Sequence, residues 1–302
     1  MELLQLHYFR TVAKHEHMTR AAQELRIAQP ALSKTISRLE EDLGVPLFDR
    51  QGRQIRLNTY GKAFLDKVNA ALNLLEEGRR EVVDLAGMDH GSIHLAAPTL
   101  DRLTEPLGAF VSRYPDVNIR ITQAPTEEMT RLIDSGEVDF CFSAMPLEGQ
   151  WIRSASVLRE DVYLAVSAGH RLAGRQSVSL KEITDEPFIG YKEEFVFQRM
   201  NDAFFREAGI APKFICRVDE PSAVAKLVQA GLGIALIGSC GRDPKSELTT
   251  IPIEYPVCKR DFKIFWHDKR YLSLAARKFR EAIIAYYADP LDGENALATL
   301  SS

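Results

Sequence analysis

Polar and basic side chains near the start of the chain have the types and spacing that bind a polyanion. Ser33 and Lys34 lie on the polar face of one predicted helix, and the next segment carries Arg50, Arg53 and Arg56. Hydroxyl groups can hydrogen-bond base edges, whereas lysine and arginine bind phosphates. The net charge of −4 excludes binding through bulk positive charge, so any contact with nucleic acid must come from this local patch.

Two short helices with a tight turn between them are predicted to position the first part of this patch. Thr19 is a suitable N-cap for the first helix, and Pro30 suits the first turn of the second, which stops at Gly44. The apolar stripe of the second helix consists of Leu32, Ile36, Leu39 and Leu43. This pattern favours a helix-turn-helix, and the alternative is any other three-helix subdomain.

The segment VPLFDRQGRQIRLN, which follows, predicts a small β-hairpin. In the strand that follows a Gln-Gly turn, Ile55 and Leu57 face one way, and Gln54 and Arg56 face the other. Arginines on a projecting hairpin suit phosphate or minor-groove contacts, as in a wing beside a helix-turn-helix. A solvated hairpin without such contacts is the alternative.

Together these motifs resemble the N-terminal signature of LysR-type transcriptional regulators. The residues that carry the resemblance are Ala21, Ala22, Leu25, Gln29, Pro30, Ala31, Ser33, Ile36, Leu39, Glu40, Leu43, Gly44, Leu47, Phe48, Arg50, Arg53, Leu57 and Gly61. The resemblance implies that the helix from Gln29 enters the major groove and that the wing grips the DNA backbone. The implied DNA contacts are Thr19, Gln29, Pro30, Ser33, Lys34, Arg50 and Arg53. The chain departs from the family pattern at Ala28, Asn58 and Tyr60.

A long helix over residues 59–86 is predicted next, because the segment lacks proline and repeats apolar residues in steps of four and three. The repeat consists of Phe64, Val68, Ala71, Leu75, Gly78, Val82 and Leu85. Such a seam needs a partner helix, and packing on its own domain is the alternative. In the family this helix dimerises, which implies contacts between subunits through Phe64, Val68, Ala71, Leu75 and Val82.

Strands and helices alternate from residue 92 onward, which indicates an α/β architecture with a last helix at about 274–287. This region resembles the family's effector-binding domain, which has the bilobal fold of periplasmic binding proteins. The resemblance places two crossing strands near 162–166 and 264–266. The expected parts are a winged helix-turn-helix at 1–58, a linker helix at 59–86, a hinge at 87–91 and an effector domain at 92–302. Within the effector domain, lobe I takes about 92–161 and 267–290, lobe II about 162–266, and a mobile tail 291–302.

An effector site is expected where loops leave strand ends and enter helix N-termini. The loops that qualify supply Thr99 and Arg102, Thr126, and Tyr191 and Phe195. Hydroxyl, cationic and aromatic groups that converge in this way suit a small organic acid or an amino-acid-like metabolite. Each residue has a simpler alternative: Thr126 is a good helix N-cap, and Arg102 can face water.

Other patterns point away from catalysis, a metal site or a cofactor. The segment GLGIA lacks the third glycine of a dinucleotide site, and His15 and His17 have no third ligand nearby. The scattered cysteines contain no CxxC pair. By resemblance, peroxide sensors of the family carry a cysteine pair in the segment equivalent to GYKEEFVFQRMNDAFF, and this chain has none there. Cys240 therefore reads first as a loop thiol.

These observations predict a bacterial, cytoplasmic, sequence-specific regulator that reads an inverted repeat as a homodimer or homotetramer. Its expected partners are double-stranded promoter DNA, a small-molecule effector and RNA polymerase, with no membrane, metal or cofactor. Two alternatives remain: a ligand-binding protein whose N-terminal helices only oligomerise it, and an enzyme on the bilobal fold.

Overall fold

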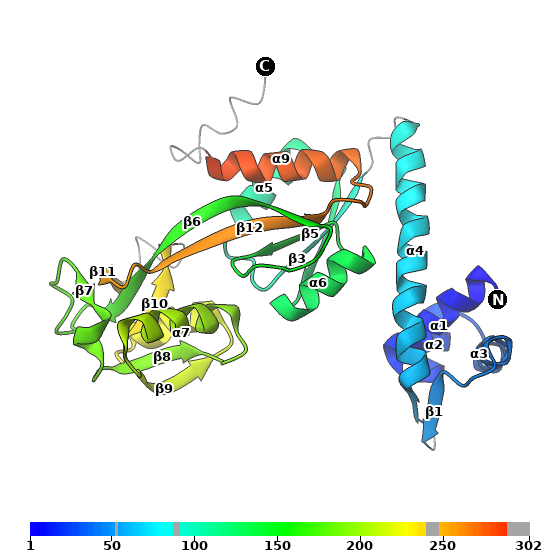
Figure 1. The fold of residues 1–302 in the computed structure, drawn as a ribbon, viewed down its shortest axis with the longest axis horizontal. Coiled ribbons are helices and arrows are strands. Elements are labelled where there is room, and N and C mark those ends of the chain that lie inside the picture. Colours follow the sequence, from blue (N-terminus) through cyan, green and yellow to red (C-terminus); the bar gives the residue numbers. More distant parts are fainter. Residues whose placement is uncertain (52–53, 87–90, 240–247, 289–302) are drawn as a thin grey trace. The chain divides into compact units, whose positions relative to one another are not determined.

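The computed structural model describes residues 1–51, 54–86, 91–239 and 248–288 (Figure 1). The chain forms two compact units. The first is Met1–Met88 with Leu132–Val138, and the second is Asp89–Arg131 with Asp139–Ser302. Within the described ranges, no helix has the length and apolar character that a bilayer crossing needs.

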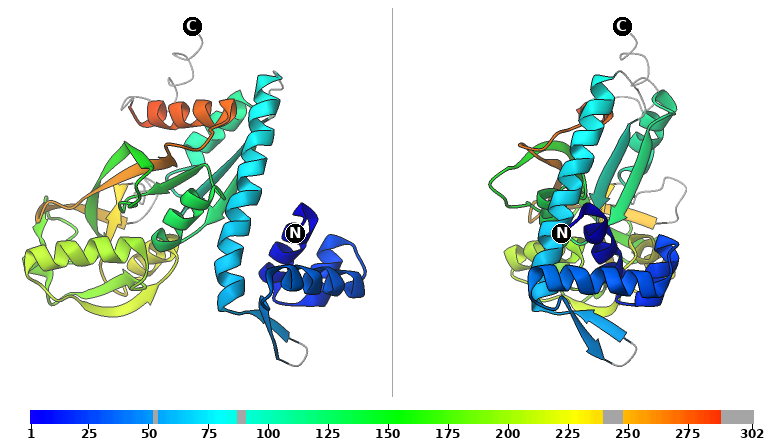
Figure 2. Two further views of the ribbon diagram at one scale, coloured as in Figure 1. Left: turned by 45° about the vertical axis from the view of Figure 1, so that its right-hand side comes forward. Right: turned by 90° about the vertical axis from the view of Figure 1, so that its right-hand side faces the viewer.

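The N-terminal part of the first unit is three helices, a two-stranded hairpin and one long helix (Figure 2). Their bounds are α1 Leu3–His15, α2 Met18–Leu25, α3 Gln29–Leu43, β1 Phe48–Gln51, β2 Gln54–Leu57 and α4 Thr59–Leu85. The buried core joins α1, α3 and α4 through Phe9, Leu32, Ile36, Leu39 and Val68. The ring of Phe9 lies 5.5 Å from that of Phe48 and 5.3 Å from that of Phe64, which ties the hairpin and α4 to the same core.

Helix ends in this region differ from the sequence prediction at one place. The N-cap of α2 is His17, whose Nδ1 accepts the Arg20 N–H at 3.4 Å, and Thr19 lies exposed within the first turn. The prediction of Thr19 as N-cap was therefore wrong, because the imidazole two residues earlier caps the helix instead. Gly44 ends α3 in the left-handed conformation at φ 72°, as the sequence predicts.

The rest of the chain alternates strands and helices. The first group is β3 Ser92–Ala97, α5 Thr104–Arg113, β4 Asn118–Gln123, α6 Thr126–Ser135, β5 Phe140–Ser143 and β6 Ile152–Ser167. The second group is β7 Val178–Ser179, the 3₁₀ turn Leu180–Ile183, β8 Pro187–Tyr191, α7 Val196–Ala208, β9 Lys213–Val218, α8 Pro221–Gln229, β10 Ala235–Gly238 and β11 Leu248–Tyr255. The chain then returns through β12 Lys259–His267 to α9 Leu274–Ala288.

Strand β6 runs through two lobes. Its first part pairs antiparallel with β12, and its second part pairs with β10 and β11. The sheet order is β4-β3-β5-β12-β6-β11-β7, while β8 and β9 form a separate parallel pair (Figure 1). Residues 162–166 pair on the second-lobe side, and Ile264 and Phe265 pair with β5 on the first-lobe side. The two segments predicted to cross therefore flank the crossing, which lies nearer 158–161 and 259–262.

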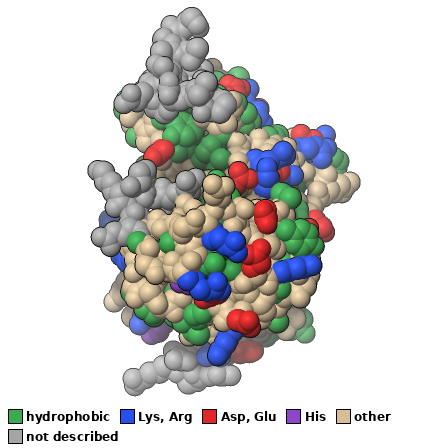
Figure 3. Space-filling view, turned by 90° about the vertical axis from the view of Figure 1, so that its left-hand side faces the viewer, with side chains coloured by type: hydrophobic (Ala, Val, Ile, Leu, Met, Phe, Trp, Pro, Cys, Tyr) green, Lys and Arg blue, Asp and Glu red, His purple; other side chains and the backbone are tan. Residues whose placement is uncertain are grey.

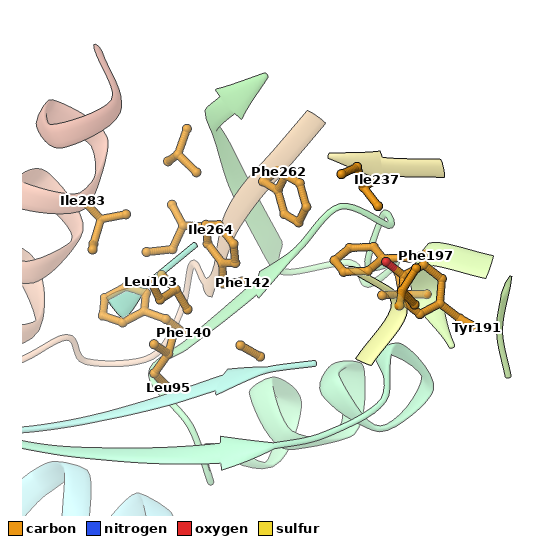
Figure 4. Packing of buried hydrophobic residues seen from close by; sticks show 14 of the residues in the cluster. Leu95, Leu103, Phe140, Phe142, Tyr191, Phe197, Ile237, Phe262, Ile264 and Ile283 are labelled. Carbon is orange, nitrogen blue, oxygen red and sulfur yellow. The ribbon is translucent and has the colours of Figure 1, made fainter. Parts of the chain in front are cut away.

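Buried side chains are continuous along the crossing strands. Phe262 of β12 lies between the group around Phe140 and the pair Tyr191 and Phe197 of the second lobe (Figure 4). The second lobe also has a core of its own, which includes Leu164, Phe188 and Phe205. The two lobes thus share apolar packing at the crossing.

Candidate DNA-binding interface and effector site

Helix α3 separates a buried face from a polar one. Leu32, Ile36 and Leu39 are at most 2 % exposed, whereas Gln29, Pro30 and Lys34 are exposed and Ser33 is half-buried. The structure thus brings these four predicted contacts onto the first turns of one helix. Such an arrangement presents amide, hydroxyl and ammonium groups together, as base and phosphate contacts require.

The start of α3 has no side-chain cap. Ala28 is the N-cap and accepts the N–H groups of Ala31 at 3.0 Å and Leu32 at 3.1 Å through its backbone carbonyl, but it has no side chain to bind another. Pro30 removes one donor from the first turn, which lessens the need for a cap. The remaining backbone N–H groups of the first turn lie at the same end of α3 as its polar side chains.

The hairpin has the register that a wing needs. Arg50 pairs with Ile55, and Arg56 pairs with Asp49, so that arginines lie on both strands. Arg53 lies outside the described residues. Figure 2 shows the strands projecting away from the three helices.

Asn58 and Gly61 join the hairpin to α4. Asn58 accepts the Gly61 N–H at 2.8 Å as the N-cap of α4 and donates its side-chain amide to the Pro46 carbonyl at 2.8 Å. A Cβ on Gly61 would lie 2.1 Å from the Leu47 carbonyl oxygen, so glycine is required there. The departure at Asn58 therefore replaces the usual threonine with another capping residue.

The apolar seam of α4 divides into two parts. Val68 is 2 % exposed and Phe64 half-buried, because both pack into the core with α1. Ala71, Leu75 and Val82 are exposed, Leu75 at 57 % and Val82 at 66 %. Packing within the chain thus accounts for Phe64 and Val68, and the exposed part of the seam begins at Ala71.

In the second unit, Arg102 is buried where the two lobes meet. Its Nη2 lies 2.5 Å from Oε1 of Glu160 on β6, and only 4 % of its side chain is exposed. The guanidinium also lies 4.3 Å from the ring centroid of Phe262 on β12 and 4.9 Å from that of Phe197 on α7. Arg102 therefore does not face water, and it contacts both crossing strands and the second lobe.

Glu160 is the centre of a cluster that sequence reasoning missed. Its Oε1 is also 3.6 Å from Nη1 of Arg260 on β12, and its Oε2 accepts the Ser239 hydroxyl at 3.4 Å. Arg260 in turn donates to Asn201 of α7 at 2.9 Å. The only sequence signal was a pair of charges on apolar strands, and the partners are far apart along the chain.

Two predicted effector residues at this junction each have a buried polar atom without a hydrogen-bond partner among the described residues: Nε of Arg102 and Oγ1 of Thr126. Thr126 begins α6 but does not cap it through its hydroxyl, so the expectation of a side-chain cap was wrong. Buried polar groups in proteins are nearly always hydrogen-bonded, and an exception calls for an explanation such as a ligand. Both atoms are therefore candidates for contact with the effector.

The other predicted effector residues lie nearby in the same domain. Thr99 is half-buried after β3, close in sequence to Arg102. Tyr191 is 3 % exposed, and its ring stacks on Phe195 at 5.3 Å and contacts Phe197 edge-on at 5.7 Å. The Tyr191 N–H donates to Gln198 of α7 at 2.9 Å. The aromatic group is thus a packed wall of the second lobe, with Phe195 its least buried member.

An exposed ion pair also joins the lobes. Glu127, in the first turn of α6, binds Arg199 of α7. A backbone N–H bond within Glu127 and the Arg199 guanidinium hold the pKa of this carboxyl below its usual range. Side-chain contacts among the described residues therefore bridge the lobes both in the buried interior and at the surface.

Cys141 and Cys258 are buried, whereas Cys216 is half-buried. Burial raises the pKa of the Cys141 thiol well above its usual range and that of Cys258 to about 12. Cys240 lies outside the described residues. Among the residues that the structure describes, no group of His, Cys, Asp and Glu is arranged to hold a metal ion.

Comparison with known proteins agrees with these features. The family described as "Bacterial regulatory helix-turn-helix protein, lysR family" matches residues 3–62, and the "LysR substrate binding domain" family matches residues 86–288. YybE of Bacillus subtilis, an uncharacterized HTH-type transcriptional regulator, is 37 % identical over 297 residues, which cover 96 % of this chain and 100 % of YybE.

Two solved structures share the fold. Full-length CbnR in complex with its target DNA has a TM-score of 0.71 at 24 % identity, with 94 % of this chain and 99 % of CbnR covered. The effector-binding domain of QuiR in complex with shikimate has a TM-score of 0.58 at 21 % identity, with 66 % of this chain and 98 % of that domain covered. With a helix-turn-helix, a long linker helix and a bilobal α/β domain all matched, the chain belongs to the LysR family of transcriptional regulators.

Proposed function

We propose that the protein reads a specific inverted-repeat promoter site and that a small anionic or amino-acid-like metabolite, bound between its lobes, controls this activity. The observation that carries the effector half is the buried Arg102, whose Nε has no partner among the described residues while its Nη2 binds Glu160. Nε and Nη2 form one edge of the guanidinium, which can hold a carboxylate with two parallel bonds. Glu160 uses only part of that edge.

The DNA half of the proposal rests on α3 and the wing. We expect Gln29, Pro30 and Ser33 to read bases, and Lys34, Arg50 and Arg53 to bind phosphates. CbnR, which has the same fold, has been solved with its target DNA. The proposed site of action is the cytoplasm, where promoter DNA and RNA polymerase are its partners.

Self-association forms a further part of the proposal. Leu75 and Val82 are large apolar side chains exposed on one helix, and a second copy of α4 would cover them. Leu75→Asp and Val82→Asp should each lower the mass of the particle in sedimentation equilibrium. An unchanged mass in both variants would remove α4 as the dimer contact.

An effector acid would bind with the Thr126 hydroxyl, the Thr99 hydroxyl and the first turn of α6, whose N–H groups favour negative charge. QuiR, whose effector domain shares this fold, was solved with shikimate, a carboxylic acid.

Thermal unfolding of the full chain with a panel of organic acids and amino acids tests the effector half. A ligand at 100 times its dissociation constant adds about 2.7 kcal/mol, which raises the midpoint by roughly 5–10 °C for a domain of this size. The shift should be abolished in Thr99→Ala and Thr126→Ala. A shift that persists in both variants would place the ligand elsewhere.

A further inference from the structure

The wing is too small to fix its own orientation. Its strands β1 and β2 have four residues each, and a two-stranded hairpin of this length is at best marginally stable in water. For its arginines to meet the DNA backbone together with α3, the hairpin must be held from outside. The side chains of Phe48 and Leu57 pack against the helical core, and two carboxylates bind the backbone at the base of the hairpin.

The first carboxylate is Glu40, near the end of α3. Its Oε1 accepts the N–H groups of Leu47 at 2.8 Å and Phe48 at 3.3 Å, where the chain enters β1. An acidic residue in the last turn opposes the helix dipole, so helix stability does not explain its presence. Bonds from backbone N–H groups to an ionised carboxylate are about twice as strong as neutral ones.

The second carboxylate is Glu16, which directly follows α1. Its Oε1 accepts the N–H of Leu57 at 3.0 Å, at the end of β2. The backbone of Glu16 is in the left-handed region at φ 43°, where glycine or asparagine would be easier to place. A glutamate at such a position is explained by what its side chain binds.

Both carboxylates act on one rung of the hairpin. Phe48 and Leu57 are direct partners in the β1–β2 register, and the N–H of each is bound by a glutamate from a different helix end. We propose that Glu16 and Glu40 are positioning residues for DNA binding, which fix the wing relative to α3. This inference rests on the proposed DNA contacts of α3 and the wing.

For removal of either carboxylate, this role and simple electrostatics predict opposite changes in the affinity for DNA. A carboxylate near a polyanion repels it, so removal of either charge should strengthen binding if charge alone matters. If the carboxylate positions the wing, its removal should weaken binding. Glutamine separates the two effects, because its Oε1 still accepts N–H groups but carries no charge.

The experiment measures the affinity of the full chain for two fluorescent duplexes of equal length, over a series of salt concentrations. One duplex is selected by the wild-type protein from a random pool, and the other has random sequence. The variants are Glu40→Ala, Glu40→Gln, Glu16→Ala and Glu16→Gln. The matched control pair is Glu41→Ala and Glu41→Gln, at the exposed neighbour on the same turn.

We expect Glu40→Ala to weaken binding to the selected duplex by about tenfold, because two charge-assisted hydrogen bonds no longer hold the wing. Its salt slope should fall by about 0.9 for each phosphate that the wing no longer reaches. Glu40→Gln should bind within about twofold of wild type, since a neutral acceptor retains most of the bond. Glu16→Ala should also weaken binding to the selected duplex, but by less, because Glu16 is exposed. The Glu41 variants should bind as tightly as wild type or more tightly.

A double-mutant cycle separates wing position from general loss of stability. Arg56 is an exposed wing arginine one residue before Leu57. Arg56→Ala should weaken binding in the wild-type background and have little effect in Glu40→Ala or Glu16→Ala. A destabilised but otherwise normal domain would keep the full Arg56 effect at temperatures below its unfolding midpoint.

Equal affinities for alanine and glutamine variants at both glutamates, or tighter binding by the alanine variants, would overturn the inference. A full Arg56 effect in the alanine backgrounds would do the same. If wild type itself bound neither duplex in a salt-dependent way, the proposed DNA binding would fail first. The two failures are therefore distinguishable.

Discussion

Glu40 is half-buried and Glu160 is buried, and the two glutamates bind partners of different kinds. Glu40 binds backbone N–H groups of the wing, whereas Glu160 binds the side chain of Arg102. The direction of a backbone N–H group is fixed by the conformation of its segment, so it cannot rotate toward another acceptor. A guanidinium has several donors and can exchange one carboxylate for another. The first arrangement keeps a segment in place, whereas in the second the donors of Arg102 can change their acceptor.

Removal of Glu160 should give the largest effect on folding. Glu160→Ala leaves Arg102 buried without its counter-charge, so we expect the free energy of unfolding to fall by about 3–5 kcal/mol. Glu40→Ala should cost only about 1–3 kcal/mol, because it leaves two backbone N–H groups without their acceptor but no buried charge unpaired. Urea unfolding of both variants provides the measurement. Equal decreases would contradict the distinction between the two glutamates.

Glu160→Gln should strengthen acid binding. The amide keeps the shape of the side chain but leaves the Arg102 charge to an effector, so the affinity for a carboxylate ligand should rise by about tenfold. Calorimetric titration with the acid found in the thermal screen, and with its neutral amide as control, measures this change. If the acid and the amide gained equally, Arg102 would not be the group that binds the acid.

In the DNA-binding region, Arg50→Ala should have a moderate effect on the affinity for DNA. Removal of one phosphate-binding side chain reduces the salt slope by about 0.9 and weakens binding to selected and random duplexes alike. Ser33→Ala should instead weaken binding to the selected duplex more than to the random one. Fluorescence anisotropy at several salt concentrations distinguishes them. An unchanged slope in Arg50→Ala would remove that residue from the phosphate contacts.

The exposed bridge between the lobes should contribute least. Because the pKa of Glu127 is lowered in the folded state, the carboxylate stabilises the fold above its ordinary pKa, and this contribution disappears as the pH falls through the lowered value. Both partners are largely exposed, so the gain is below about 1 kcal/mol. Unfolding of wild type and Arg199→Gln should differ at pH 7, and the difference should shrink as the pH falls through the lowered pKa of Glu127.

The N-terminal elements could be predicted from the sequence because their signals are local. Pro30, Gly44 and the apolar stripe from Leu32 lie within one helix or at its ends, and the structure has the helix they predict. The N-cap of α2 was missed because imidazole is an unusual cap. Phe64 and Val68 illustrate a different limit of sequence-based prediction. An apolar repeat predicts which face of a helix is buried, but not which neighbour buries it.

The junction of the lobes could be predicted only in part. Arg102 and Thr126 were predicted as effector residues because their loops follow strands, but Glu160 and Arg260 lie within strands and meet only through the fold. The same holds for Glu16 and Leu57, which are 41 residues apart in sequence. Contacts between distant segments depend on how strands and helices pack and pair with one another, which the local patterns of a single sequence do not reveal.

The continuity of β6 through both lobes has a mechanical consequence. Since β6 and β12 both continue where the lobes join, with one bulge between Phe262 and Lys263, rotation of one lobe against the other must be taken up largely as added twist along paired strands. Strand pairs accommodate twist over a wide range, but they resist stretching and sliding because each residue is tied to its partner. We therefore expect the lobes to turn about the axis of this ribbon in small, elastic steps. The opening of a flexible loop hinge would be larger and less directed.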